Sequence, residues 1–302
     1  MRNLIAAVCA ALLALSVSLP AHAAALAPAP RPIESFDVGM LHVERFGSGD
    51  SVVLVPGLAS GAWTWNAVIP HLAATHSVYA VTFAGFSGRP AASGDVTFAR
   101  FDADLSALLT SRAIVKPALV GHSLGGTLVI AYAEAHPDRV RTVVAVDGLP
   151  IFPMLAQMTA DQRSAAAKQL ADSVRSQTDE QFATYESGYM ASVGVTDAGL
   201  AKEIAALSAR SDRATVAAWL QADLVTDLRP QLGMLAVPPT EITGYSPAEP
   251  YTQEQKAAFY RTLLTGASKA DVVVIPGAKH FVMLDQPEQF AAALDHALRA
   301  VP

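Results

Sequence analysis

The chain has 302 residues, of which 52% are hydrophobic and 16% are charged, and this composition is typical of a globular protein with a large apolar core. Its length is compatible with one α/β domain, because such domains often reach about 250 residues. The formal net charge of −6, without any run of Lys or Arg, argues against nucleic acid as a partner, because phosphate binding requires a concentrated basic surface.

The N-terminus is typical of an export signal. Arg2 supplies a short positive start, residues 4–19 are almost entirely apolar, and a small-x-small pattern ends at Ala23. The apolar stretch is short for a membrane span, which needs about 20 residues, so an uncleaved anchor is the weaker alternative. We therefore expect a cleaved signal peptide at 1–23, a periplasmic or secreted protein, and no stable membrane insertion after cleavage.

Two consequences follow for the mature chain. The only cysteine, Cys9, lies inside the expected signal, so disulfides would not contribute to stability. Residues 24–32 are rich in Ala and Pro and predict a flexible or extended leader.

After the leader, short apolar segments alternate with segments of helical spacing. Strands are predicted at 33–38 and 40–46, which would form a hairpin, and at 52–55, 77–83, 118–120, 140–146, 239–245 and 271–275. Helices are predicted at 63–72, 98–111, 124–136, 254–264 and 287–299. This alternation predicts an α/β fold, with a mostly parallel sheet covered by helices on both faces. The turns that follow the strands meet at the carboxyl edge, where ligands bind.

Residues 152–230 interrupt this alternation, because they show helical patterns and no convincing strand. The helices are expected at 161–175, 179–190, 198–209 and 214–224. An insertion of this kind predicts a helical cap over the carboxyl edge of a core formed by residues 33–151 and 231–302. The alternative is a small, independent helical domain.

The segment from Ala118 to Gly126 contains the motif Gly-x-Ser-x-Gly, centred on Ser123. The motif lies between a predicted strand and a predicted helix, which is the context of a nucleophile on a sharp turn. Glycines at 121 and 125 supply the small neighbours that such a turn requires. The N–H of Leu124 would then lie at a helix N-terminus, where an oxyanion is stabilised. A purely structural Gly-rich turn is the alternative.

His280 is the best candidate for the general base. It follows the strand predicted at 271–275 and a Pro-Gly-Ala turn, so it lies at the carboxyl edge, late in the chain. His71, His76 and His136 lie at or beyond helix ends, where capping or solvent exposure explains them. His122, the neighbour of the nucleophile in sequence, is expected to pack within the wall of the site.

Five segments together resemble the α/β-hydrolase superfamily, particularly its esterase-like members with a helical cap. They are Val52–Leu58, Trp63–Trp65, Phe83–Gly88, Gly277–His280 and Asp285–Glu288. Two departures are visible, because Pro56 stands where many members have histidine and the usual aspartate of the 83–88 turn is absent. The resemblance implies the same fold, and it implies the N–H of Leu58 as a second oxyanion donor opposite Leu124.

The acid of the triad is open at this stage. Many members carry it as Gly-x-x-Asp after the strand that follows the cap, but here that segment begins at Gly244 and has Pro247 in the place of the acid. Glu249 lies two residues later. The other known position is the end of the strand before the cap, where Asp147 follows the apolar strand. We favour Asp147, with Glu249 and the absence of a strict acid as alternatives.

These residues predict acyl-enzyme hydrolysis of a small, largely apolar ester, without a metal or other cofactor. Trp63 and Met154 are the candidate substrate contacts, although apolar cap residues can equally pack internally. The alternatives are C–C or lactone hydrolysis, aminopeptidase action on an N-terminal proline and cofactor-free oxygenation on the same triad, or ligand binding without catalysis.

Overall fold

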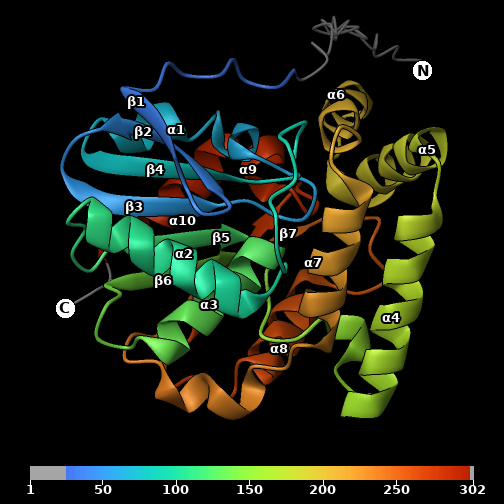
Figure 1. Cartoon of the computed structure of the whole chain (residues 1–302). Helices are drawn as coiled ribbons and strands as arrows, with labels where there is room; N and C mark the ends of the chain where they lie inside the picture. Colours follow the sequence, from blue (N-terminus) through green and yellow to red (C-terminus); the bar gives the residue numbers. More distant parts are fainter. Residues whose placement is uncertain (1–24, 300–302) are drawn as a thin grey trace, which may run out of the picture.

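The computed structural model describes residues 25–299, which form one eight-stranded sheet with helices on both faces (Figure 1). The predicted export signal therefore lies outside the described residues. The strands are β1 (Glu34–Val38), β2 (Leu41–Gly47), β3 (Asp50–Val55), β4 (His76–Phe83), β5 (Ala118–His122), β6 (Thr142–Val146), β7 (Thr240–Tyr245) and β8 (Asp271–Pro276).

The sheet has the strand order β1-β2-β4-β3-β5-β6-β7-β8. The pairs β1–β2 and β2–β4 are antiparallel, and every other pair is parallel. The predicted fold class is confirmed, including the antiparallel hairpin at one edge.

The longer helices agree with the predicted segments except at one place, and the four-residue helix at 282–285 lies in no predicted segment. The core helices are α1 (Ile69–Ala73), α2 (Phe98–Ser111), α3 (Leu124–Ala135), α8 (Gln253–Leu263), α9 (Val282–Asp285) and α10 (Pro287–Arg299). The single helix expected at 63–72 is instead a 3₁₀ turn, η1 (Ala62–Trp65), followed by the short α1. Pro70 lies in the first turn of α1, where its missing N–H is tolerated but where it cannot continue a helix from before.

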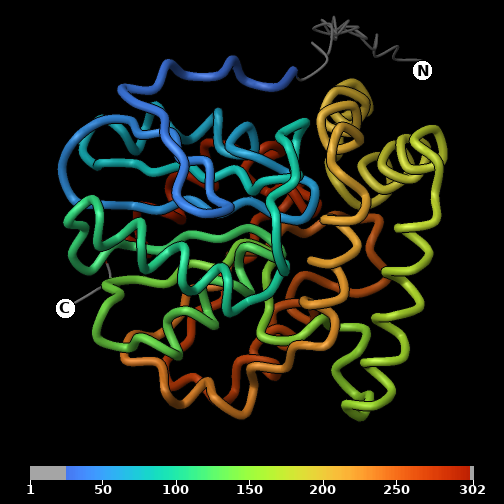
Figure 2. Tube along the Cα trace, viewed as in Figure 1, coloured from blue at the N-terminus to red at the C-terminus, as the bar shows by residue number. Residues whose placement is uncertain are grey.

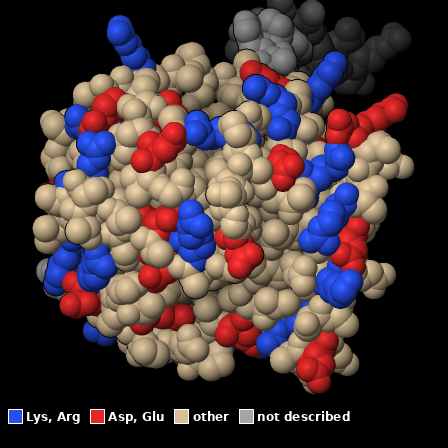
Figure 3. Space-filling model, viewed as in Figure 1, with Lys and Arg blue, Asp and Glu red and all other residues tan. Residues whose placement is uncertain are grey.

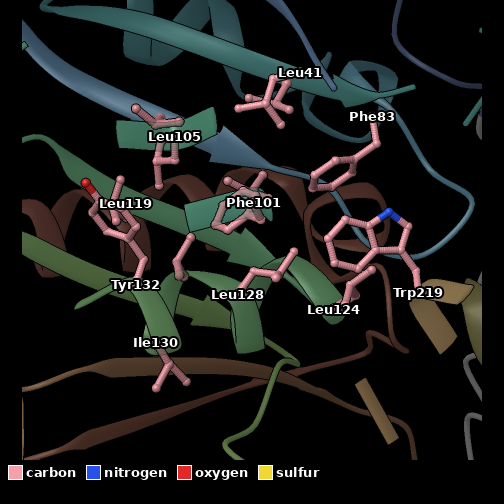
Figure 4. Close-up of a cluster of buried hydrophobic side chains, with 14 of the residues drawn as sticks. Leu41, Phe83, Phe101, Leu105, Leu119, Leu124, Leu128, Ile130, Tyr132 and Trp219 are labelled. Carbon is pink, nitrogen blue, oxygen red and sulfur yellow. The ribbon is translucent and has the colours of Figure 1, made fainter. Parts of the chain in front are cut away.

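Alternation along the buried strands divides the core between the two faces of the sheet. Val53, Leu119 and Val143 belong to the cluster that includes residues of α2 and α3, part of which Figure 4 shows. Val52 and Val120 belong to a second cluster with residues of α1 and α10. The parallel strands are thus buried on both faces, as their continuous apolar sequences predict.

Between β6 and β7 the chain forms a helical segment beside the sheet (Figure 2). It consists of η2 (Pro153–Leu155), α4 (Ala160–Ser176), α5 (Asp179–Tyr189), a π-helical turn η3 (Met190–Gly194), α6 (Ala198–Ser208), α7 (Arg213–Val225) and η4 (Arg229–Met234). An isolated antiparallel bridge joins Ile151 to Asp227, so the segment leaves and re-enters the core at one point. Trp219 of α7 packs against Phe83 of β4 with ring centroids 5.2 Å apart (Figure 4), and buried residues of the segment belong to both main clusters.

The start of the described chain contacts both the core and the helical segment. The Leu26 N–H donates to Glu203 of α6 at 3.0 Å, and the Asn66 side chain donates to the Ala27 carbonyl at 2.9 Å. Within residues 25–299, no helix is both long and apolar enough to cross a membrane. Acidic and basic side chains are interspersed over the face that Figure 3 displays, without a field of one sign.

Glu134 of α3 is an uncompensated carboxyl group in the core and predicts a pH dependence of stability. The residue is 3% exposed, its Oε1 has no hydrogen-bond partner among the described residues, and burial raises its pKa to about 7. A raised native-state pKa contributes stability that is present at low pH and is lost as the pH rises through about 7. The gain in unfolding free energy of Glu134→Gln over the wild type should therefore be larger at pH 8.5 than at pH 5, by up to about 3 kcal/mol.

Thermal unfolding of the wild type and Glu134→Gln at both pH values measures this difference. The exposed Glu180 of α5 provides the control, because a surface substitution such as Glu180→Gln should change stability by no more than about 0.5 kcal/mol at either pH. Equal slopes for all three proteins would contradict the assignment.

Candidate active site

Ser123 occupies a strained turn between β5 and α3. Its backbone has φ 52° and ψ −122°, a conformation that costs a non-glycine residue about 1–3 kcal/mol. A Cβ at Gly121 would lie 2.1 Å from the carbonyl oxygen of Gly125, and a Cβ at Gly125 would lie 2.4 Å from that of Val55. Both positions therefore exclude any larger residue. The turn leaves Ser123 partly exposed at the carboxyl edge of the sheet.

A glycine at the end of β7 allows the His280 loop to cross that strand. The loop follows β8, whereas Asp147 follows β6, and β7 lies between these two strands. A Cβ at Gly244 would lie 2.4 Å from the carbonyl oxygen of Lys279, so the loop passes directly over this residue. The Gly277 N–H donates to the Tyr245 carbonyl at 2.8 Å and fixes the start of the loop.

The crossing brings His280 into contact with Asp147. The His280 Nδ1–H donates to Asp147 Oδ2 at 2.6 Å, and both side chains are 13% exposed. Because the carboxylate is an acceptor, the proton of the neutral ring belongs on Nδ1, and Nε2 remains available to accept a proton. Asp147 itself has φ 48°, a left-handed conformation that aspartate tolerates better than most residues.

The second oxygen of Asp147 is held by two hydroxyl groups. Thr243 Oγ1 donates to Asp147 Oδ1 at 2.6 Å, and the Tyr260 hydroxyl donates to the same oxygen at 2.7 Å. Burial alone would raise the pKa of Asp147, but the hydrogen bond and charge of His280, with smaller contributions from Lys256 and Thr243, hold it well below its usual range. Burial, chiefly, raises the pKa of Tyr260, which therefore remains a proton donor. Asp147 is thus a buried carboxylate with a donor for each oxygen.

Glu249, the alternative acid, is engaged elsewhere. Its Oε1 accepts the Ser246 N–H at 2.7 Å, and its Oε2 accepts from Lys256 Nζ at 3.0 Å. The structure therefore brings Asp147, and not Glu249, to the imidazole of His280.

His122 holds the His280 loop through a hydrogen bond and a ring contact. It is fully buried, and its Nε2 lies 3.1 Å from the backbone carbonyl oxygen of His280. Burial holds the pKa of His122 well below its ordinary value, so this imidazole is neutral and donates one N–H to that carbonyl. Its ring also packs against those of His280 and Phe281, with centroids 4.6 and 4.5 Å away. This agrees with the expected packing role.

The two predicted oxyanion donors belong to the residue after Ser123 and to the segment that follows β3. Leu124 is the first residue of α3, where an N–H has no acceptor within the helix. Leu58 follows Gly57, and a Cβ at Gly57 would lie 3.1 Å from Ser123 Cβ, so the chain after β3 passes close to the serine. A Cβ there would also lie 2.8 Å from His122 Nδ1, so a larger residue at position 57 would displace the side chains of the site.

A pocket of about 890 Å³ lies beside the His280–Asp147 pair. Met154, one of the predicted substrate contacts, lines the pocket and is 82% exposed. Trp63, the other, does not line it, because its ring stacks on Phe281 at 5.9 Å and its Nε1–H donates to Ser87 at 2.9 Å. Within residues 25–299, no group of three or more His, Cys, Asp or Glu side chains is arranged to hold a metal ion.

Sequence patterns gave no indication of three residues around the acid, namely Thr243, Lys256 and Tyr260. Thr243 is a polar residue of β7, but the same strand also contains Thr240 and Glu241, so its sequence does not single out Thr243 as a partner of the acid. Tyr260 and Lys256 occur at ordinary helical positions, and only the packing of α8 reveals their role.

The serine turn generates a prediction about stability. Gly125→Ala should lower the melting temperature and disturb the turn, because backbone atoms that cannot move aside surround the position. Gly188 in α5 is the matched control, since nothing lies within 4 Å of a Cβ there. Gly188→Ala should be neutral or stabilising by up to about 1 kcal/mol. Comparable melting temperatures for the two variants would contradict the close packing of the turn.

Comparison with known proteins identifies the relatives of this chain. It is 28% identical over 248 residues to a pimeloyl-[acyl-carrier protein] methyl ester esterase of Edwardsiella ictaluri, covering 80% of this chain and 91% of that protein. A second esterase of this name, from Aeromonas hydrophila, is 34% identical over 113 residues, but the match spans only 36% of this chain and 42% of that relative. A 2-(acetamidomethylene)succinate hydrolase of Mesorhizobium japonicum is 26% identical over 280 residues, covering 87% of this chain and 94% of that protein.

Among solved structures, a thermophilic esterase of Thermogutta terrifontis has the same fold. The TM-score is 0.73 at 20% sequence identity, over 88% of this chain and 98% of that one. A model described as the alpha/beta hydrolase family matches residues 52–293, which include Ser123, Asp147 and His280. The chain therefore belongs to the alpha/beta hydrolase family.

Proposed function

We propose that this protein is a serine hydrolase that cleaves a small, largely apolar ester through an acyl-enzyme. Ser123 is the nucleophile, His280 the general base and Asp147 the acid of the triad. The observation that carries the proposal is the 2.6 Å hydrogen bond between His280 and Asp147, formed at the same sheet edge as the strained turn of Ser123.

Each group has one task in the proposed reaction. Ser123 Oγ attacks the ester carbonyl while His280 Nε2 takes its proton, and Asp147 stabilises the resulting imidazolium. The N–H groups of Leu58 and Leu124 stabilise the oxyanion of the tetrahedral intermediate. His280 then protonates the leaving alcohol, and a water molecule activated by the same imidazole hydrolyses the acyl-enzyme.

The surroundings of the triad support this chemistry. The hydroxyl groups of Thr243 and Tyr260 keep Asp147 ionised and in place, so the imidazole retains one tautomer and one orientation. Relatives named as esterases support the choice of an ester. We also propose that the helical segment at 152–230 acts as a cap over the site and that the chain is exported through the signal at 1–23 to the periplasm or outside the cell.

Hydrolysis of p-nitrophenyl esters from acetate to octanoate tests the proposal. The wild type should release p-nitrophenolate from short or medium chains, and Ser123→Ala should lose at least about 10³-fold in kcat, since nucleophile and base act as one unit. The melting temperature of Ser123→Ala should stay close to that of the wild type, because the substitution removes a partly exposed hydroxyl group and leaves the backbone conformation unchanged. A folded wild type without turnover of any ester, or an active Ser123→Ala, would contradict the proposal.

A further inference from the structure

We infer that Asp285 is a positioning residue for the proposed general base, and that it holds the loop of His280 against the π-helical turn η3 of the helical segment. Catalysis then depends on a contact outside the triad, which joins the base to the helices between β6 and β7. This inference rests on the proposed function, in which His280 is the base.

The turn η3 ends a longer helix and has carbonyl groups that need partners. It continues α5, and the Val195 N–H closes it by donating to the Met190 carbonyl at 3.1 Å, five residues back as in a π-helix. The last carbonyl groups of a helix receive no hydrogen bond from within that helix. Single π-helical turns are rare and are frequently found at functional sites. Donors from another part of the chain must therefore satisfy the end of η3.

The loop that carries the base supplies these donors. The His280 N–H donates to the Val193 carbonyl at 3.1 Å, and the Phe281 N–H donates to the Gly194 carbonyl at 2.9 Å. The carbonyl oxygen of His280 lies 3.1 Å from His122 Nε2. The helical segment thus holds the N–H of His280, while the core holds its carbonyl group.

The carboxylate of Asp285 bridges the two segments next to this contact. Its Oδ2 accepts the backbone N–H of Lys279, the residue before His280, at 2.8 Å. Its Oδ1 accepts both the N–H and the hydroxyl group of Thr196, which follows η3, at 2.8 Å each. Hydrogen bonds to a carboxylate are about twice as strong as those between neutral groups. Asp285 therefore fixes the His280 loop to the end of the turn.

This bridge controls the position of the imidazole relative to the acid. The His280 ring lies between its 2.6 Å hydrogen bond to Asp147 and the edge of the Tyr189 ring, whose centroid is 6.2 Å away. A misplacement of about 1 Å in a catalytic group can cost about 10²-fold in rate. A shift of the loop therefore lowers kcat without removing any group that contacts the substrate.

Substitutions at position 285 test this role through the rate of p-nitrophenyl acetate hydrolysis. Asp285→Ala should lower kcat by about 10- to 100-fold and change KM by less than about threefold. Asp285→Asn retains one acceptor oxygen, so its kcat should lie between those of the wild type and Asp285→Ala. Asp295 of α10 is the matched control, because it is also a partly buried carboxylate but pairs with His71. Asp295→Ala should keep the wild-type kcat.

The hydroxyl group of Thr196 tests the other end of the bridge. Thr196→Val keeps the shape of the side chain and the backbone N–H, and it should lower kcat by about twofold or more. In the Asp285→Ala background the same substitution should have no effect, because the acceptor of the hydroxyl group is already absent. Equal fold-losses in the two backgrounds would contradict the bridge.

Proton NMR tests the same inference without turnover. The Nδ1–H of His280 should give a strongly downfield resonance that exchanges slowly, because its hydrogen bond is short and the pair is 13% exposed. Asp147→Asn identifies this resonance by removing it. Asp285→Ala should shift or broaden the resonance, whereas Asp295→Ala should leave it unchanged. If Asp285→Ala does not fold, Asp285→Asn provides the same comparison.

Two results would overturn the inference. The first is a wild-type kcat in the folded variants at position 285, and the second is a lowered kcat with an unchanged Nδ1–H resonance, because the base would then be correctly placed. Absence of ester turnover in the wild type would instead contradict the proposed function, and the NMR comparison would then decide alone whether Asp285 positions His280.

Discussion

The hydrogen bond between His280 Nδ1 and Asp147 Oδ2 is the interaction on which the proposed site depends, and the order of the sheet makes it possible. Asp147 follows β6 and His280 follows β8, so the loop after β8 must cross the end of β7. Gly244 leaves room for that crossing, and the neutral His122 hydrogen-bonds to the backbone carbonyl of His280 within the loop. The contact therefore depends on the strand order of the sheet and on glycine at position 244.

Several of these features are unfavourable on their own. Ser123 and Asp147 both have positive φ, and Asp147 is a buried carboxylate. Each conformation costs about 1–3 kcal/mol, and a buried charge is tolerated only when it is paired and hydrogen-bonded. The three donors around Asp147 satisfy this condition, and the apolar clusters on both faces of the sheet hold the surrounding backbone in place. The rigidity of the core thus maintains a geometry that the local sequence disfavours.

Much of this arrangement was predictable from the sequence, because local patterns determine it. The apolar strands and the Gly-x-Ser-x-Gly motif predicted the sheet and the serine turn, and the end of the fourth apolar parallel strand predicted the position of Asp147. What escaped prediction depends on tertiary packing. Tyr260 reaches Asp147 only because α8 packs beside β8, and Trp63 lies on Phe281 instead of in the pocket. Pro70 also divides a helix that periodicity alone presents as continuous.

The identity of the acid is the central claim, and paired neutral variants test it most directly. Ester hydrolysis should be measured for Asp147→Asn and Glu249→Gln, with melting temperatures to confirm that both proteins are folded. Asp147→Asn should lose up to about 10⁴-fold in kcat, as in the serine protease for which such a loss is documented, because the imidazole would lose the carboxylate that sets its tautomer. Glu249→Gln should stay within a few-fold of the wild type, since Glu249 pairs with Lys256 instead of His280. A large loss in Glu249→Gln together with an active Asp147→Asn would contradict the account.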